Sequence, residues 1–361
     1  MKKTTFATLD GLRGLAAVAV FTRHVPSRAW AWWLPGSYLA VDLFFMISGF
    51  VLAHAYGERL NRDLSTGRFM LARFIRLWPM YILGTLAVLF VHIAGTPAGQ
   101  PVAWHGLVPS ALFGLFMLPT PPAVSGVTSP FPLNGPAWSL FWELTISIVF
   151  AVLGPRMRAG RLALVVAVGA GLLVATAGTF GSLDSGFDWS NFLGGGGRVV
   201  FTFFAGVAIY RVQQARPSRG VPAWIWAIVL GAVFAGHVAP AWRAIYDVAM
   251  VVAVFPTIVY MGACREPQGW LRWLALALGK ISYPLYVIQV ALISGASLAC
   301  ARLFGIEFSA LSHVGTFGLL AFGMMLALVL ARFYDEPVRA WLTRRSKLGT
   351  RSVRAAEAAA P

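Results

Sequence analysis

The chain has 361 residues, of which 58% are hydrophobic and only 12% are charged, about half the charged share of an ordinary soluble domain. This composition excludes a soluble domain, which would expose large apolar patches, and a disordered chain, which would lack apolar residues. The formal net charge is nevertheless +16. A nucleic-acid-binding protein would gather this charge in a basic stripe, whereas a polytopic membrane protein would place it in loops on one side.

Ten stretches of the sequence are apolar over the roughly 20 residues that a helix needs to cross a bilayer. They run over about 7–25, 38–56, 77–95, 131–154, 162–181, 194–212, 221–239, 244–263, 281–303 and 312–333. The pattern predicts an all-α polytopic membrane protein. A shorter apolar run at 111–118 predicts an interfacial or re-entrant segment in an outer loop of about 96–130, which we expect to form an ordered cap.

The positive residues gather on one side of the predicted membrane. With the N-terminus in the cytoplasm, 24 of the 29 lysines and arginines fall on the cytoplasmic side, as the positive-inside rule requires. We therefore predict that both termini are cytoplasmic and that nucleic acid is not a partner. Residues 1–340 form the expected membrane domain, and 341–361 form a basic tail that we expect to be disordered. The cysteines and histidines show no metal-binding spacing, so no metal site is predicted.

The first span contains Arg13 and His24, which are eleven residues apart. Eleven residues of α-helix make about three turns and rise about 16 Å, so both side chains lie on one face, with Arg13 nearer the cytoplasm. Asp10 lies one turn before Arg13 and can pair with it. Because ionisable residues are costly inside a bilayer, this face is a candidate functional site. The alternative is that Arg13 snorkels to the interface and that His24 is interfacial.

Asp42 begins the second span at its outer end, the depth predicted for His24. A carboxylate beside a histidine fixes the tautomer of the ring and raises its basicity. Alternatively, Asp42 only starts a helix, because acidic residues suit the first turn. The spacing alone leaves both interpretations open.

Positive residues recur on the cytoplasmic side. Arg73 and Arg76 lie one turn apart before the third span and could bind one phosphate together. Lys280, at the inner start of the ninth span, can also reach an anion. An ordinary positive-inside loop is the alternative for the arginine pair.

Glu143 lies within the fourth span without a local counter-ion. Its partner must come from another helix, and Arg13 and His24 are the candidates. Trp138, which lies five residues before Glu143, could belong to an aromatic belt. Taken together, the predicted depths place a positive cluster near the cytoplasm and His24 with Asp42 about three helical turns further out. A phosphorylated carrier could dock inside while an acceptor arrives from outside.

Six motifs in order resemble a known family. They are LDGLRGLAAVAVF at 9–21 with His24, VDLFFMISGF at 41–50, Arg73-x-x-Arg76, WSLFWEL at 138–144, KISYPLY at 280–286 and the segment from Tyr334 to Pro337. Over residues 9 to about 339 the sequence resembles the acyltransferase 3 family of integral membrane acyl-CoA-dependent O-acyltransferases. Members of this family include O-antigen and exopolysaccharide acetylases and some macrolide acylases.

The resemblance implies that acyl-CoA, usually acetyl-CoA, is a co-substrate and not a permanently bound cofactor. It implies that His24 is the essential catalytic residue and that Arg13 and the Arg73/Arg76 pair serve the CoA. We add Lys280 to these donor-binding residues, and expect Asp42 to orient His24 as a general base that deprotonates an acceptor hydroxyl. An acyl-His24 intermediate is the competing mechanism.

The expected acceptor is a glycan, an exopolysaccharide or a glycosylated small molecule, and the expected location is the cell (inner) membrane, among its lipids. The residues expected to line the channel for the acceptor or the acyl arm are Asn134, Trp138, Ser139, Glu143 and Tyr283.

Two departures from the family pattern matter. Gln289 stands where many members have histidine, so no chemistry is assigned to it, and the soluble hydrolase-like domain of many polysaccharide acetylases is not found after the tenth span. Two rival functions remain. A secondary transporter would show inverted repeats and paired broken helices, for which the sequence gives no sign. A membrane scaffold would use the same charges as structural ion pairs only.

Overall fold

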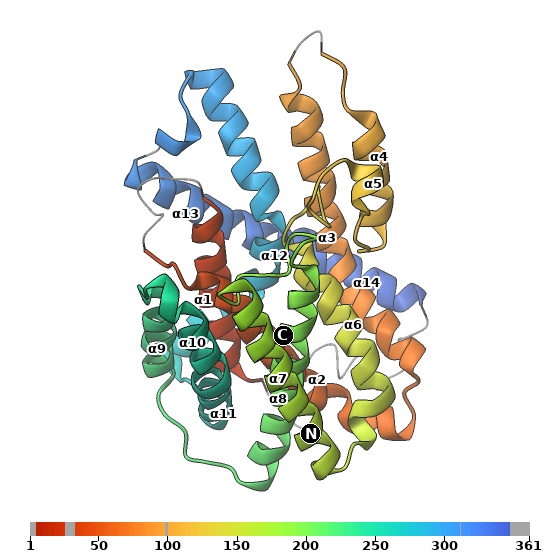
Figure 1. The fold of residues 1–361 in the computed structure, drawn as a ribbon, viewed down its shortest axis with the longest axis vertical. Coiled ribbons are helices and arrows are strands. Elements are labelled where there is room, and N and C mark those ends of the chain that lie inside the picture. Colours follow the sequence, from red (N-terminus) through yellow and green to blue (C-terminus); the bar gives the residue numbers. More distant parts are fainter. Residues whose placement is uncertain (1–4, 26–32, 98–99, 311, 347–361) are drawn as a thin grey trace.

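The computed structural model describes residues 5–25, 33–97, 100–310 and 312–346. In these ranges the chain folds into helices and contains no strand, so the predicted all-α class is confirmed. The longer helices are α1 (Ala7–His24), α2 (Ala40–Arg62), α3 (Thr66–Gly95), α4 (Trp104–Leu115), α6 (Ala137–Leu153), α7 (Ala159–Phe180), α8 (Phe192–Ala215), α9 (Ala223–Ala235), α10 (Pro240–Ala249), α11 (Phe255–Cys264), α12 (Gly269–Ala299), α13 (His313–Leu330) and α14 (Glu336–Arg345). A single turn, α5 (Pro122–Ser125), follows α4. Figure 1 shows α9, α10 and α11 on one flank and α3, α4 and α6 on the other.

Eight helical stretches of the described chain are long and apolar enough to cross a membrane. The other two predicted spans correspond to α1, which has Asp10, Arg13 and Arg23 among its 18 residues, and to α9, which has only 13 residues. The tenth span is continued by α14, which crosses the predicted domain boundary at 340 and ends at Arg345. Residues 347–361 of the expected tail lie outside the described residues.

Two helices begin well before the predicted spans. The helix α3 starts at Thr66 and not near 77, because Ser65 caps it by accepting a hydrogen bond from the backbone nitrogen of Arg68. Arg73 and Arg76 are therefore helical residues that lie inside the bundle. The helix α12 starts at Gly269 and not near 281. In both cases the hydropathy pattern marks only the apolar part of a longer helix.

Glycines allow the central helices to approach closely. A Cβ atom on Gly14 of α1 would lie 2.4 Å from Cβ of Leu278 in α12, and one on Gly206 of α8 would lie 2.0 Å from the carbonyl oxygen of Met46 in α2. Real Cβ atoms do not tolerate such distances, so these contacts require glycine. Small residues at helix interfaces are a general device of membrane bundles, where backbones pack directly together.

The expected outer cap contains α4 and α5, and it is tied to the bundle by two tryptophans. Nε1 of Trp78, in the middle of α3, donates a hydrogen bond to the carbonyl oxygen of Leu115 at 2.8 Å. Nε1 of Trp189 donates to the carbonyl oxygen of Thr120 at 3.0 Å. The glycine run at 194–197 belongs to the first turns of α8.

Candidate functional site

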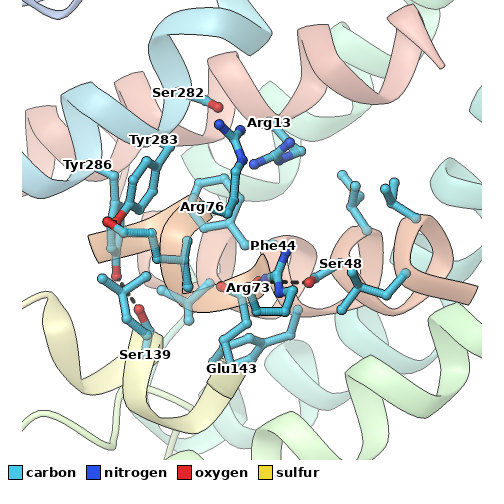
Figure 2. Close-up of a pocket in the computed structure, with 17 residues that line it drawn as sticks. Arg13, Phe44, Ser48, Arg73, Arg76, Ser139, Glu143, Ser282, Tyr283 and Tyr286 are labelled. Atoms are coloured by element: carbon cyan, nitrogen blue, oxygen red, sulfur yellow. Dashed lines mark hydrogen bonds and ion pairs between the residues drawn. The ribbon is translucent and has the colours of Figure 1, made fainter. Parts of the chain in front are cut away.

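A narrow cavity of about 80 Å³ lies among α1, α2, α3, α6 and α12, and we call it the inner cavity. Arg13 of α1 and Arg73 and Arg76 of α3 line it, as Figure 2 shows. Most of the remaining wall is apolar, with Phe44 of α2 and Leu140 of α6 as examples. The structure thus brings together three of the four residues that the sequence predicts to bind the donor.

Arg73 forms an ion pair with Glu143 that joins α3 to α6. Oε1 of Glu143 accepts from Nη2 of Arg73 and also from Oγ of Ser48, the latter at 2.8 Å. The expectation that Glu143 pairs with Arg13 or His24 is therefore wrong. The reason is the early start of α3, which places Arg73 inside the bundle opposite α6.

The other two arginines of the inner cavity also lie near carboxylates. Nη1 of Arg13 lies 3.9 Å from Oδ1 of Asp10, which confirms the predicted pairing one turn apart. Nη1 of Arg76 lies 3.9 Å from Oδ2 of Asp335. The distance between Arg13 and Asp10 exceeds that of a charge-assisted hydrogen bond, about 2.7–2.9 Å, so the guanidinium group of Arg13 keeps capacity to bind an anion.

Lys280 does not line the inner cavity. Its Nζ lies 2.8 Å from Oε1 of Glu336 at the start of α14, and about a third of each side chain is exposed. The predicted grouping of Lys280 with the three arginines is therefore wrong, because a carboxylate on a neighbouring helix holds its ammonium group elsewhere.

A second and larger cavity, which we call the outer cavity, has a volume of about 930 Å³. The end of α1 contributes Arg23 and His24, the loop before α8 contributes Asp184 and Asp188, and Arg198 lies in its wall. Nη2 of Arg23 and Oδ2 of Asp184 are 2.5 Å apart across its rim. With donors, acceptors and both signs of charge, this cavity suits a polar, hydroxyl-bearing ligand.

The tautomer of His24 follows from one hydrogen bond. Its Nδ1 lies 2.8 Å from the carbonyl oxygen of Val20, one turn earlier in α1. A carbonyl oxygen can only accept, so in the neutral ring Nδ1 carries the hydrogen and Nε2 keeps its lone pair. The side chain is exposed to the outer cavity, and no protein partner of Nε2 occurs among the described residues. His24 therefore has the protonation pattern of a general base.

Asp42 does not orient His24. Its two carboxylate oxygens are held by Arg198, with Nε to Oδ1 at 3.1 Å and Nη2 to Oδ2 at 2.7 Å. Arg198 also donates to the carbonyl oxygens of Ser185 and Tyr38, at 2.6 and 3.1 Å. The expected contact between Asp42 and His24 is replaced by this pair because a fully buried guanidinium group requires a carboxylate partner.

The residues expected to line a substrate channel do not all lie in one cavity. Ser139, Glu143 and Tyr283 line the inner cavity, and Trp138 lines the outer cavity. Asn134 lines neither of the two cavities. Its Nδ2 donates to the carbonyl oxygen of Val287 at 3.2 Å, so it joins the chain before α6 to α12.

Sequence reasoning missed two residues of the site. Arg198 is one of the five positive residues that the predicted topology does not place on the cytoplasmic side. A charge four residues into the predicted sixth span is the same signal that marked Asp42. Tyr286 lines both cavities; it ends the KISYPLY motif at 280–286, but no role was assigned to it. Gln289, to which no chemistry is assigned, is fully buried and lines neither cavity.

The sequence of the chain is similar to those of several known proteins. The chain is 40% identical over 185 residues to protein 2 in the picA locus of Rhizobium radiobacter, a match that covers 48% of this chain and 96% of that protein. It is 33% identical over 156 residues to the acyltransferase MdmB of Streptomyces mycarofaciens, covering 40% of this chain and 38% of the relative. It is 31% identical over 99 residues to the peptidoglycan O-acetyltransferase OatA of Listeria monocytogenes, covering 25% of this chain and 15% of the relative.

The matched part is thus well under half the length of the two relatives named as acyltransferases. No solved structure gives a significant match to this chain. The family model described as an acyltransferase domain, by contrast, matches residues 6–335, which include both cavities. The chain is therefore a multi-pass membrane protein that belongs to the acyltransferase 3 family.

Proposed function

We propose that the protein transfers an acyl group, in the simplest case acetyl, from cytoplasmic acyl-CoA to a hydroxyl group of a glycan or glycosylated acceptor that enters from the opposite side. The observation that carries this proposal is the position of His24. It lines a large cavity whose wall also contains charged groups of both signs, and that cavity shares the wall residues Val41 and Tyr286 with the narrow, arginine-lined cavity.

The inner cavity suits the donor. Among its lining residues three arginines face one carboxylate, that of Glu143, so the cavity has a net positive charge that favours phosphates. Its apolar wall suits an uncharged acyl arm. One water molecule needs about 10–15 Å³ of cavity volume, so a cavity of about 80 Å³ is wide enough for a narrow chain only. The nucleotide of the donor would then remain at the arginine end of the cavity.

The outer cavity suits the acceptor. In the proposed reaction Nε2 of His24 accepts the proton of an acceptor hydroxyl while that oxygen attacks the thioester carbonyl carbon. The CoA thiolate leaves and takes up a proton. General-base assistance of this kind is worth about 10²–10⁴-fold in rate. The name of the Listeria relative, a peptidoglycan O-acetyltransferase, supports acetyl as the group and a glycan as the acceptor class.

The test is transfer of label from radiolabelled acetyl-CoA to chitopentaose by the purified protein in proteoliposomes. We expect His24→Ala to abolish transfer while CoA binding persists. His237→Ala is a matched control, because Nδ1 of His237 makes the same 2.8 Å contact to a backbone carbonyl but the residue lines neither cavity. Full activity of His24→Ala would refute the role of this residue. Acid quenching separates the mechanisms, since label that stays on the protein would indicate an acyl-His24 intermediate.

A further inference from the structure

The two cavities share two wall residues among those described, Val41 of α2 and Tyr286 of α12. Val41 is apolar, so the Tyr286 hydroxyl is the one polar side-chain group in this shared wall. In Figure 2, Tyr286 and Ser139 lie at one end of the inner cavity, away from Arg13. Under the proposed function, the acyl carbon must come from the inner cavity and the acceptor oxygen from the outer one. The two can therefore meet only at this wall.

The Tyr286 side chain is held in place by three contacts. Its ring packs edge-on against Phe44, with 5.7 Å between ring centroids. Its hydroxyl lies 2.7 Å from Oγ of Ser139 and donates to the carbonyl oxygen of Pro136 at 3.2 Å. Only 6% of the residue is exposed, so its hydroxyl is a preorganised group in a largely water-excluded setting.

Attack on a thioester moves negative charge onto the carbonyl oxygen, and catalysts stabilise that charge with fixed hydrogen-bond donors. The neighbouring Ser139 lets this hydroxyl respond to a ligand. Ser139 donates its hydrogen to the carbonyl oxygen of Pro136 at 3.0 Å, so that carbonyl keeps a donor when the Tyr286 hydrogen turns away from it. The Tyr286 hydrogen can then point toward a ligand while its oxygen stays beside Ser139.

We propose that the Tyr286 hydroxyl is the donor that stabilises the oxyanion formed from the thioester carbonyl, with Ser139 as its positioning residue. The inference rests on the proposed function. The acceptor oxygen forms a bond to the carbonyl carbon as His24 takes its proton, and the carbonyl π pair moves to the oxygen beside Tyr286. When that pair returns, the carbon–sulfur bond breaks and the leaving thiolate receives the proton from His24. No oxidant or further reactant is needed.

The test compares Tyr286→Phe with the parent protein in the acetyl-CoA to chitopentaose assay. Loss of one oxyanion donor lowers kcat by about 10²–10³-fold. We expect a fall of this size at an unchanged KM for acetyl-CoA, because the ring that shapes the cavity remains. Tyr81→Phe is the control, since Tyr81 is equally buried but lines neither cavity. Ser139→Ala should give a smaller fall in kcat, because the Tyr286 hydroxyl remains but the Pro136 carbonyl, having lost the Ser139 hydrogen, competes for the Tyr286 hydrogen.

Calorimetry of CoA binding to the Tyr286→Phe protein shows whether this variant is folded, because a misfolded protein would not bind CoA. A parental kcat in Tyr286→Phe would overturn this inference and leave the proposed function standing. A rise in KM with kcat unchanged would also overturn it, since the hydroxyl would then serve binding only. Absence of any acetyl transfer by the parent protein would overturn the proposed function, and this inference with it.

Discussion

Asp42 and Arg198 form a bidentate ion pair in which both side chains are buried, with Nη2 and Oδ2 2.7 Å apart. The guanidinium group also stacks over the ring of Trp138, 5.3 Å from its centroid. The pair joins α2 to α8, and through the carbonyl of Ser185 it fixes the loop that carries Asp184 and Asp188 at the outer cavity. Asp42 thus holds Arg198 in the wall of that cavity and is not a partner of its histidine.

The first prediction concerns the stability of this pair. Removing one partner of a buried ion pair costs about 3–5 kcal/mol, because the other charge is left uncompensated. We expect Asp42→Ala to lower the thermal unfolding temperature in detergent strongly. The double variant Asp42→Leu with Arg198→Met, which removes both charges, should recover much of the loss. A stable Asp42→Ala protein with reduced kcat would instead support a direct role of Asp42 in catalysis.

The second prediction concerns donor binding by Arg76. A hydrogen bond to a charged group contributes about 1.5–3 kcal/mol, which corresponds to at least a tenfold change in affinity. We expect Arg76→Ala to raise KM for acetyl-CoA by about this factor with a much smaller effect on kcat. Arg62→Ala, an exposed residue at the end of α2, controls for general positive charge on the same side. An equal rise in KM for both variants would assign Arg76 to topology alone.

The third prediction concerns the coupling of Arg73 and Glu143. Residues in direct contact couple by about 0.5–3 kcal/mol in double-mutant cycles. We expect Arg73→Ala and Glu143→Ala to destabilise the protein individually and to be much less than additive together, because either single change leaves a buried charge. Unfolding free energies from the four proteins give the coupling. Simple additivity would show that the ion pair of α3 and α6 makes no net contribution.

The fourth prediction concerns close helix packing. Gly206→Ala places a Cβ atom 2.0 Å from the carbonyl oxygen of Met46, so α2 and α8 must move apart, and we expect a marked fall in the unfolding temperature. Gly231→Ala in α9 is the matched control, since its Cβ meets nothing within 4 Å. That change should be neutral or stabilise the protein by up to about 1 kcal/mol, as alanine favours helix. Equal effects of the two variants would contradict the packing argument.

The sequence allowed the helical class and the pairing of Arg13 with Asp10 to be predicted, because both depend on local periodicity. It also brought Arg13, Arg73 and Arg76 together correctly, since depth in the membrane follows from topology. The partner of Glu143 and the partner of Asp42 were not predictable in this way. Depth restricts a side chain to a layer, whereas the neighbour within that layer depends on how the helices are arranged around one another.

The helix starts show a related limit. The hydropathy pattern identified the apolar part of α3 from residue 77 onward, but not the first eleven residues of the helix. In the sequence, the arginines of those eleven residues resemble the arginines of a loop. The ion pair between Arg73 and a carboxylate on α6 is visible only in the structure. Lys280 shows the reverse case, because it has the right depth for the arginine cluster but a closer carboxylate on α14.

The contact between Nδ1 of His24 and the Val20 carbonyl lies within a single helix. The protonation pattern of the imidazole is therefore a local property of α1, independent of the distance to any other helix. A movement of the surrounding helices would therefore leave the lone pair on the same ring nitrogen. An orienting carboxylate on α2 would have made the strength of the base change with every such movement.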